Sequence, residues 1–541
     1  MNGLVFLVLA VTLSVLAIPV AIRLAPRLGM VDKPDPRKVH AKPIPRIGGI
    51  GITLGALLPI AILLPWTPIL ESFLLGSLIL FVFGAWDDSK EITHWIKFGG
   101  QFAAAGLIVY HGNLWVERFP FLGGELLPAY IGKPFTIFAI VGVINAINHS
   151  DGLDGLAGGE CLLSLIVMGF LAYVASDSLA VYLTCAVAGG ILGFLRFNTH
   201  PARIFMGDAG SQFIGFAMAF LAVYLTQIAH PALSPALPLL LIGLPIADIN
   251  AVFYLRISGG MNWFKATRNH IHHRLLDLGF EHYETVILIY SVQAILVGSA
   301  VLLRYQSDAL VTLVFFAIVT VLFISLTVAE RRKWEFTATP EKRALSRVVG
   351  SLTTDRRMAK HAAAAAVAMF SVLLLIGTLA VRDVPLVVAF ISFSLLVACS
   401  INLARRSGSS DSLIFRFATY SIALLVVYLT VQEPPASRWL AFGVSTPAYL
   451  VLAAITGIAI RMATEQVFRT TATDYLILFG LITISIFGRE LLEVRHISLI
   501  IVHSVIMVYA AEFTCRATQK RLSLLSVAVL LSLLILSLKG L

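Results

Sequence analysis

The feature that most limits the fold of this chain is a series of apolar runs, each about as long as a bilayer is thick. A helix needs about 20 predominantly apolar residues to cross roughly 30 Å of hydrocarbon, and such runs occupy most of the 541 residues. Only 13% of the residues are charged, whereas soluble domains carry about 25%. A soluble globular protein is therefore excluded, and we predict an all-α polytopic membrane protein.

The apolar runs form two sets, separated by the basic segment 331–360. Eleven predicted spans form the first set: 3–24, 47–64, 72–86, 99–112, 134–148, 156–176, 179–196, 211–229, 235–256, 284–303 and 308–328. Seven more follow near 361–381, 384–402, 413–431, 438–460, 472–487, 495–511 and 521–538. We predict a membrane domain at 1–330, a basic cytoplasmic linker at 331–360 and a C-terminal helical membrane domain at 361–541.

The distribution of Lys and Arg sets the predicted orientation. With the N-terminus outside, the loops and helix ends on the inner side hold 32 of the 40 Lys and Arg residues. Because an excess of Lys and Arg marks cytoplasmic loops, we place the N-terminus outside. The net charge of +10 is explained by the same bias, so no nucleic-acid partner is predicted.

Three aspartates at predicted helix ends are candidate metal ligands. Asp87 and Asp88 are adjacent at the end of one predicted helix, and Asp208 stands between glycines shortly before another. Aspartates in such places either cap a helix or hold a divalent cation. Oxygen donors without a Cys/His cage favour Mg²⁺ or Mn²⁺ over zinc, so we predict a magnesium site.

A polar stripe is predicted between two apolar runs. Asn145, Asn148, Asp151 and Asp154 follow one another at intervals of three residues. On a helix this spacing places the four side chains on one face. A glycine-rich hinge is the alternative, but a hinge has no need of two Asp and two Asn at helical spacing. We expect the stripe to face the site.

A cluster of imidazoles and guanidinium groups lies at 268–274. His270, His272, His273 and Arg274 follow Arg268 closely, and such donors suit phosphate oxygens. A His-rich metal site is the rival interpretation, but its usual i, i+4 spacing on a helix is missing. We therefore predict pyrophosphate binding here.

All of these clusters fall in loops predicted to face the cytoplasm. A transporter places its functional ionisable groups near the bilayer midplane, whereas here they gather at one face of the membrane. The pattern favours an interfacial enzyme that draws one substrate from the cytosol and another from the bilayer. A transporter or lipid flippase is the alternative, with 361–541 as a transport or partner-docking module.

Five motifs in fixed order resemble a known family. DDSKE (87–91), NAINHSDGLDGLAGG (145–159), FNTHPARIFMGDAGS (197–211), NHIHHRLLDLG (269–279) and the early DKPDPRKVHAKPIPRIGG (32–49) are similar to the loops of the polyprenyl-phosphate N-acetylhexosamine-1-phosphate transferases of the WecA/TagO type. The resemblance covers about 1–328 and leaves 331–541 unexplained.

The resemblance implies transfer of a sugar-1-phosphate from a UDP-N-acetylhexosamine, most often UDP-GlcNAc, to undecaprenyl or another polyprenyl phosphate, with release of UMP. It implies Mg²⁺, with Mn²⁺ as the alternative, and a cytoplasmic active site in the bacterial inner membrane. The partners are then the two substrates and membrane lipids, and a homodimer stays open.

The residue pattern and the resemblance together give the predicted site. The predicted catalytic residues are Asp87, Asp88, Asp151 and Asp154, and the predicted metal ligands are Asp208 and Asp88. The predicted substrate-binding residues are Asn145, Asn148, Asn198, Arg203, His270, His272, His273, Arg274, Lys38, His40 and Lys42. Direct attack by the lipid phosphate is preferred over a two-step route through an aspartyl intermediate.

Overall fold

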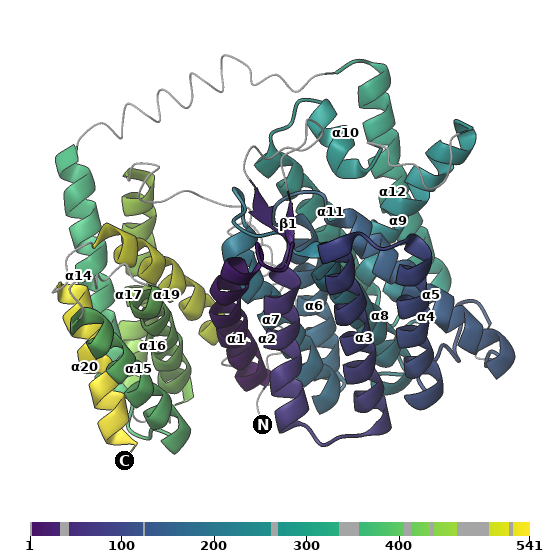
Figure 1. Cartoon of the computed structure of the whole chain (residues 1–541). Coiled ribbons are helices and arrows are strands. Elements are labelled where there is room, and N and C mark those ends of the chain that lie inside the picture. Colours follow the sequence, from purple (N-terminus) through teal and green to yellow (C-terminus); the bar gives the residue numbers. More distant parts are fainter. Residues whose placement is uncertain are drawn as a thin grey trace. The chain divides into compact units, whose positions relative to one another are not determined.

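The structure is a computed structural model that describes residues 3–32, 43–122, 125–260, 269–334, 356–404, 413–432, 438–462, 497–518 and 523–540. The predicted all-α class is confirmed, because the described residues are almost entirely helical (Figure 1). One short antiparallel pair joins β1 (Val31–Asp32) to β2 (Ile44–Pro45). The described residues fall into two compact units, one within 1–337 and one that begins at 338.

Every predicted span of the first set is a helix in the structure. The helices of this first unit are α1 (Gly3–Leu24), α2 (Gly48–Leu63), α3 (Pro68–Lys90), α4 (His94–Gly106), α5 (Ala129–Ser150), α6 (Leu156–Val174), α7 (Ser178–Asn198), α8 (Gly207–Tyr224), α9 (Pro238–Ser258), the short α10 (Ile271–Asp277), α11 (His282–Leu303) and α12 (Asp308–Arg331). Two π-helical turns, η1 (Leu107–His111) and η2 (Leu225–Ala229), extend α4 and α8. Nine helices of this unit are long and apolar enough to span a membrane.

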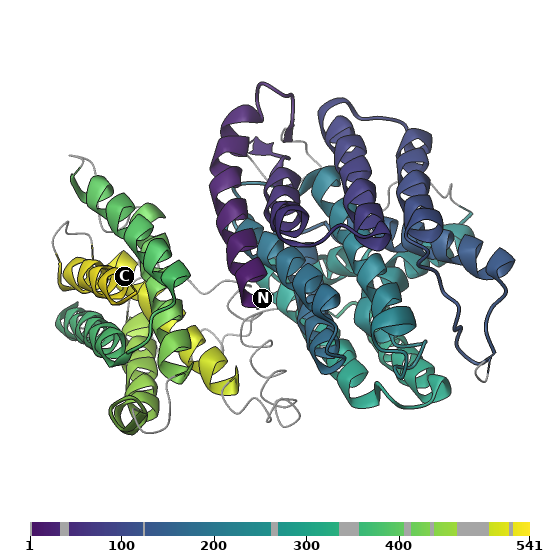
Figure 2. The ribbon, with the colours of Figure 1, turned by 90° about the horizontal axis from the view of Figure 1, so that it is seen from below.

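The most enclosed of these spans is α8 together with η2. Of its apolar window 83% is buried, against 17% for α12. It packs against α2, α3 and α5, and Figure 2 shows these helices from one end. Small residues allow the close approach, since a Cβ on Gly84 of α3 would lie 2.5 Å from the Cα of Ala209. The first turn of α8 is therefore closely packed against its neighbours, and this packing fixes the positions of the side chains in that turn.

The second unit is a separate bundle with its own apolar core. Its described helices are α14 (Arg356–Ala380), α15 (Leu386–Ala404), α16 (Leu413–Gln432), α17 (Arg438–Met462), α19 (Ile497–Ala517) and α20 (Leu524–Lys539). Phe370, Phe415 and Leu452 are fully buried in the core. The predicted span near 472–487 lies outside the described residues, so the expected count of about seven helices is not confirmed.

Candidate active site

Polar residues that are far apart in the sequence converge where several helices of the first unit begin or end. The backbone N–H of Asp208 donates to Asp88 Oδ1 at 2.9 Å, and Asn148 Nδ2 donates to Ser211 Oγ at 2.7 Å. Asn198 Oδ1 accepts a hydrogen bond of 2.8 Å from the backbone of Gly155. The ends of α3 and α5 thus meet the beginning of α8, and the end of α7 meets the residue that precedes α6.

We call Asp87, Asp88 and Asp208 the carboxylate centre. Lys97 Nζ lies 2.6 Å from Asp87 Oδ2 and 2.8 Å from Asp208 Oδ2. Arg46 lies 3.4 Å from Asp88 Oδ1 and 3.9 Å from Asp208 Oδ1. Three carboxylates and two basic groups therefore share one small volume, and their like charges are held together by Lys97 and Arg46.

Lys97 and Arg46 are not among the site residues predicted from the sequence. Lys97 is the only Lys, Arg, Asp or Glu in α4, and a lone cation in an apolar helix signals that a partner lies nearby. That signal would have identified Lys97. Arg46 stands among several basic residues of the loop 23–46, where its position alone does not distinguish it.

Asp88 is bound by the N-terminus of α8. Its Oδ1 accepts from the backbone of Asp208 and its Oδ2 from the backbone of Ala209, at 2.9 and 3.0 Å. Gly207 makes this possible, because its φ is +71° and a Cβ there would lie 2.5 Å from Asp88 Oδ2. Both oxygens of Asp88 are thus engaged by backbone donors, and the contact fixes the first turn of α8, which carries Asp208.

Asp87 and Asp208 differ from Asp88 in what they face. The Oδ1 of Asp87 accepts from the backbone of Ile92 at 2.9 Å, while its Oδ2 points at the ammonium of Lys97. Asp208 presents Oδ2 to the same ammonium. A single cation thus lies within reach of one oxygen from each carboxylate. Such oxygen donors suit a hard divalent cation, so the residues present fit a metal of that class.

The predicted stripe of four polar residues is only half correct. Asn145 and Asn148 lie on α5, and Asn145 Nδ2 donates to Gln101 Oε1 at 2.7 Å. However, α5 ends at Ser150, so Asp151 and Asp154 stand in the turn that follows. The helix ends two residues before Gly152, where a Cβ would collide with the imidazole of His272.

Asp151 stands in that turn, close enough to Asp208 to respond to its charge. Burial, together with the negative charge of Asp208, raises the pKa of Asp151 to about 7. A carboxyl group with a pKa near neutrality is suited to accept or give up a proton. The predicted catalytic role of Asp151 is therefore compatible with its surroundings.

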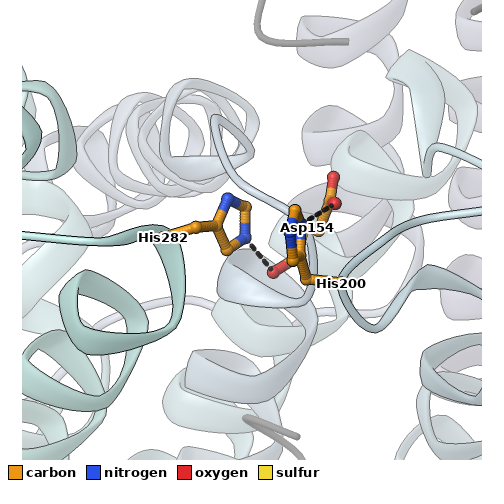
Figure 3. A group of neighbouring side chains, drawn as sticks. All are labelled: Asp154, His200 and His282. Carbon is orange, nitrogen blue, oxygen red and sulfur yellow. Dashed lines mark hydrogen bonds and ion pairs between the residues drawn. The ribbon is translucent and has the colours of Figure 1, made fainter. Parts of the chain in front are cut away.

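The side chain of Asp154 faces His200, and its backbone oxygen faces His282 (Figure 3). His200 Nδ1 lies 2.7 Å from Asp154 Oδ2, which also accepts from the backbone of Ala202 at 3.0 Å. His282 Nε2 lies 3.2 Å from the backbone oxygen of Asp154. We call Asp154, His200 and His282 the Asp154 clasp. It ties together three segments: the loop after α5, the loop after α7 and the start of α11.

The Asp154 clasp is better explained as a structural tie than as a metal centre. Its potential ligand atoms lie within 4.8 Å of one another, but the two imidazoles stack with centroids 4.1 Å apart and planes only 24° apart. Nearly parallel rings do not aim their nitrogens at one ion. Burial alone would raise the pKa of Asp154, but the hydrogen bonds from His200 and Ala202 outweigh it and lower this pKa.

The predicted pyrophosphate-binding residues lie on and before α10. His272 is buried against Gly152, and His273 stacks at a tilt on His272, with centroids 4.3 Å apart. Arg274 turns toward α12, where its Nε and Nη2 donate to Glu330 at 2.7 and 2.8 Å. His272 thus reaches the turn after α5, whereas Arg274 is engaged elsewhere.

The remaining predicted substrate-binding residues differ in how far the structure describes them. Asn198 is buried and holds the loops, since its Nδ2 also donates to the backbone oxygen of Ile204 at 2.9 Å. Arg203 is exposed in the same loop. Lys38, His40 and Lys42 lie outside the described residues.

A large apolar cavity of about 1380 Å³ reaches the polar site. Side chains of α4, α5, α9 and η2 line it. Its polar end is formed by Lys97, near the start of α4, and by Asn148 and Arg256, near the ends of α5 and α9. Phe119 and Phe121 line it from the segment between η1 and α5. A cavity of this kind suits a long apolar molecule with an anionic head group. The fold and the site thus define a class: a membrane-embedded enzyme that brings a polar substrate to a lipid.

Comparison with known proteins gives this class a family. The family model described as "Glycosyl transferase family 4" matches residues 70–226. The chain is 33% identical over 317 residues to the probable undecaprenyl-phosphate N-acetylglucosaminyl 1-phosphate transferase of Bacillus subtilis, covering 58% of this chain and 88% of that protein. It is 32% identical over 291 residues to the undecaprenyl-phosphate alpha-N-acetylglucosaminyl 1-phosphate transferase of Escherichia coli K12, covering 52% and 79%. The chain belongs to glycosyl transferase family 4.

Proposed function

We propose that this protein transfers GlcNAc-1-phosphate, or another N-acetylhexosamine-1-phosphate, from a UDP-sugar to undecaprenyl or another polyprenyl phosphate and releases UMP. This reaction would begin the assembly of a cell-envelope glycan. The relatives named above support the reaction class. The observation that carries the proposal is that Asp87 and Asp208 face one cation position at the polar end of an apolar cavity.

The main obstacle to this reaction is repulsion between two anionic substrates. When bound, Mg²⁺, or Mn²⁺ in its place, neutralises the charge of the donor pyrophosphate. We assign Asp208 and Asp87 as the residues that hold it. Asp88 is one of the two predicted metal ligands, but both of its oxygens are engaged by backbone N–H groups. We therefore assign it the role of fixing the start of α8 and put Asp87 in its place as the second ligand. Asp88 then contributes to the metal site by positioning Asp208.

The apolar cavity is the proposed site for the polyprenyl chain. Its polar end offers Lys97, Asn148 and Arg256 to the lipid phosphate, while His272 and His273 lie where they suit the donor pyrophosphate. An oxygen of the lipid phosphate attacks the β-phosphorus, the bond from that phosphorus to the bridging oxygen breaks, and UMP leaves with the electron pair. Asp151 is the proposed acceptor for a proton on the lipid phosphate.

Direct transfer is preferred over a route through an aspartyl intermediate, because phosphoryl transfer needs positioning and charge neutralisation more than covalent help. The test is to incubate the protein with a UDP-sugar labelled in its β-phosphate and no lipid acceptor, denature it and measure protein-bound label. Label on the denatured protein would overturn direct transfer.

We propose residues 1–330 as the catalytic unit, 331–360 as a cytoplasmic linker and 361–541 as a helical module for partner docking or oligomer contact. The site is placed on the cytoplasmic face of the inner membrane because the loops that carry it hold most Lys and Arg residues. The first unit expressed without 361–541 should keep transferase activity. Loss of activity from a well-folded first unit would contradict this division.

The proposed function is tested by UMP release from the purified full-length protein. The protein is given undecaprenyl phosphate, Mg²⁺ and a panel of UDP-sugars, with chelator and no-lipid controls. We expect UMP release that needs both Mg²⁺ and lipid and is fastest with UDP-GlcNAc. Release from another UDP-N-acetylhexosamine alone would change the sugar but keep the reaction. No release from any UDP-sugar would overturn the proposal.

A further inference from the structure

Asp248 is a buried carboxylate that lies outside the carboxylate centre. It belongs to α9, and only 7% of its surface is exposed. Its Oδ2 lies 2.7 Å from His270 Nδ1, and its Oδ1 accepts from the backbone of Ile271 at 2.8 Å. A buried carboxylate is costly unless it is hydrogen-bonded. Here both oxygens are engaged by two consecutive residues at the start of α10.

His270 is the middle member of a row of three nearly parallel imidazoles. Its ring lies 5.8 Å from that of His149 with 15° between the planes, and 5.7 Å from that of His272 with 8° between them. His149 lies in the last turn of α5, directly after Asn148, and both residues line the apolar cavity. The row therefore extends from α10 to the polar site, and Asp248 holds its central ring from behind.

The contact with Asp248 also determines where His270 carries its proton. A carboxylate only accepts hydrogen bonds, so the nitrogen that faces it, Nδ1, must carry a hydrogen. A ring that also carries a hydrogen at Nε2 is an imidazolium, whose positive charge the neighbouring carboxylate of Asp248 compensates. An Nε2–H group on such a ring is a strong donor for a phosphate oxygen.

We propose that Asp248 is a positioning residue for the transfer reaction: it fixes the ring and proton of His270 and thereby prepares the imidazole row for the donor pyrophosphate. The proposal rests on the proposed function. It also links the two substrates, because Ile246, Ile249 and Asn250 of the same helix line the apolar cavity. The helix that borders the proposed lipid site thus also holds the start of α10.

The test compares Asp248→Asn, His270→Gln and the double variant in the full-length protein. An amide in this place has one oxygen and one NH2 group. When its oxygen keeps the hydrogen bond from Ile271, its NH2 group faces His270 Nδ1 and disfavours a hydrogen on that nitrogen. We expect each single variant to lower kcat/KM for the UDP-sugar about 10- to 100-fold, as loss of an orienting partner does elsewhere. The double variant should lose little more than either single variant, because the residues act as one unit.

Asp177→Asn is the matched control. Asp177 also uses its carboxylate at a helix end, where it accepts from the backbone of Ala180 at 2.8 Å and from Tyr224 at 3.2 Å, but it caps the opposite end of α7 from Asn198. We expect wild-type kcat/KM from this variant. The pH–rate profile separates the roles further. A positioning role predicts an altered pH–rate profile in Asp248→Asn. A merely structural role would lower the fraction of active protein and leave the shape of the profile unchanged.

UDP binding, measured by calorimetry, distinguishes failure of this inference from failure of the proposed function. Asp248→Asn should bind UDP about 10-fold more weakly than wild type and Asp177→Asn. Wild-type UDP affinity or kcat/KM in Asp248→Asn, or multiplying effects in the double variant, would overturn the role of Asp248 alone. A wild-type protein that binds UDP but releases no UMP would overturn only the reaction, and one that does neither would overturn both.

Discussion

The carboxylate centre and the Asp154 clasp are two neighbouring uses of aspartate that differ in their partners. In the carboxylate centre, Asp87 and Asp208 share the ammonium of Lys97. In the Asp154 clasp, one carboxylate oxygen accepts from His200 and from a backbone N–H group. The first arrangement concentrates negative charge around a cation position, and the second distributes hydrogen bonds among three chain segments.

This difference shows that the role of an aspartate cannot be inferred from its residue type or from its closeness in sequence to another aspartate. Asp151 and Asp154 are three residues apart, yet the pKa of Asp151 is raised by burial and by the charge of Asp208, while that of Asp154 is lowered by its hydrogen bonds. The carboxylate centre has the surroundings of a cation site, and the clasp has those of a fold-stabilising contact. Substitutions in the two groups should therefore have different consequences.

The largest effect is expected from Asp208→Asn. Loss of a metal-holding carboxylate removes several kcal/mol of transition-state stabilisation, so kcat should fall at least about 10³-fold. The measurement is UMP release by purified protein. Asp177→Asn serves as the control, and a thermal unfolding curve shows whether the variant is folded. Near wild-type turnover by Asp208→Asn would remove Asp208 from the metal site.

The next effect concerns Lys97, which holds the carboxylate centre together without a metal. Lys97→Met leaves the carboxylates of Asp87 and Asp208 without their common partner, which costs about 3–5 kcal/mol for a fully buried pair and less here, because the Lys97 side chain is 28% exposed. We expect a lower Tm in chelator and a larger rise of Tm on adding Mg²⁺ than in wild type. An equal Mg²⁺-induced rise would indicate that the cation binds elsewhere.

Much of this architecture could be predicted from the sequence. The eleven apolar runs before 331 are all helices. An apolar run long enough to cross a bilayer forms a helix because its backbone groups must hydrogen-bond to one another in lipid. The convergence of Asp87, Asp88 and Asp208 was also predicted, from motifs placed in loops on one side of the membrane. Loops on the same side of a membrane domain lie at one face of it, so their motifs come near one another.

The finer arrangement could not be predicted, because it depends on where helices stop and which group reaches which partner. A three-residue spacing indicated a helical stripe through Asp154, but α5 ends at Ser150, where His272 of a distant segment packs against Gly152. The partners of Asp154 and Asp248 are likewise distant in the sequence. Periodicity describes one helix at a time and carries no information about such contacts.

A smaller effect is expected from His200→Ala in the Asp154 clasp. It removes one partly buried hydrogen bond to Asp154, which typically costs about 1–2 kcal/mol. We expect a modestly lower free energy of unfolding and a loss of turnover below about 10-fold, measured by denaturant unfolding and UMP release. A loss as large as that of Asp208→Asn would place the clasp in the chemistry instead of the fold.

The smallest and most specific effect is that Asp151 and Asp154 should change the stability with opposite dependence on pH. The measured quantity is the free energy of unfolding of wild type minus that of the variant, Asp151→Asn or Asp154→Asn, in the presence of chelator. The folded-state pKa of Asp151 is about 7, above the ordinary value of 3.8 for an Asp carboxyl group, so the folded state retains a proton that the unfolded chain releases. Relative to Asp151→Asn, wild type should therefore lose stability as pH rises from about 4 to about 7.

Asp154 has a lowered pKa, so its contribution has the opposite sign. The stability of wild type relative to Asp154→Asn should be fully present above about pH 4 and should be lost as pH falls below that value. Opposite slopes for two aspartates three residues apart would show that Asp151 responds to the negative charge of the carboxylate centre and Asp154 to the hydrogen-bond donors of the Asp154 clasp. Parallel slopes would mean that both side chains share one environment, and the distinction between the two groups would no longer hold.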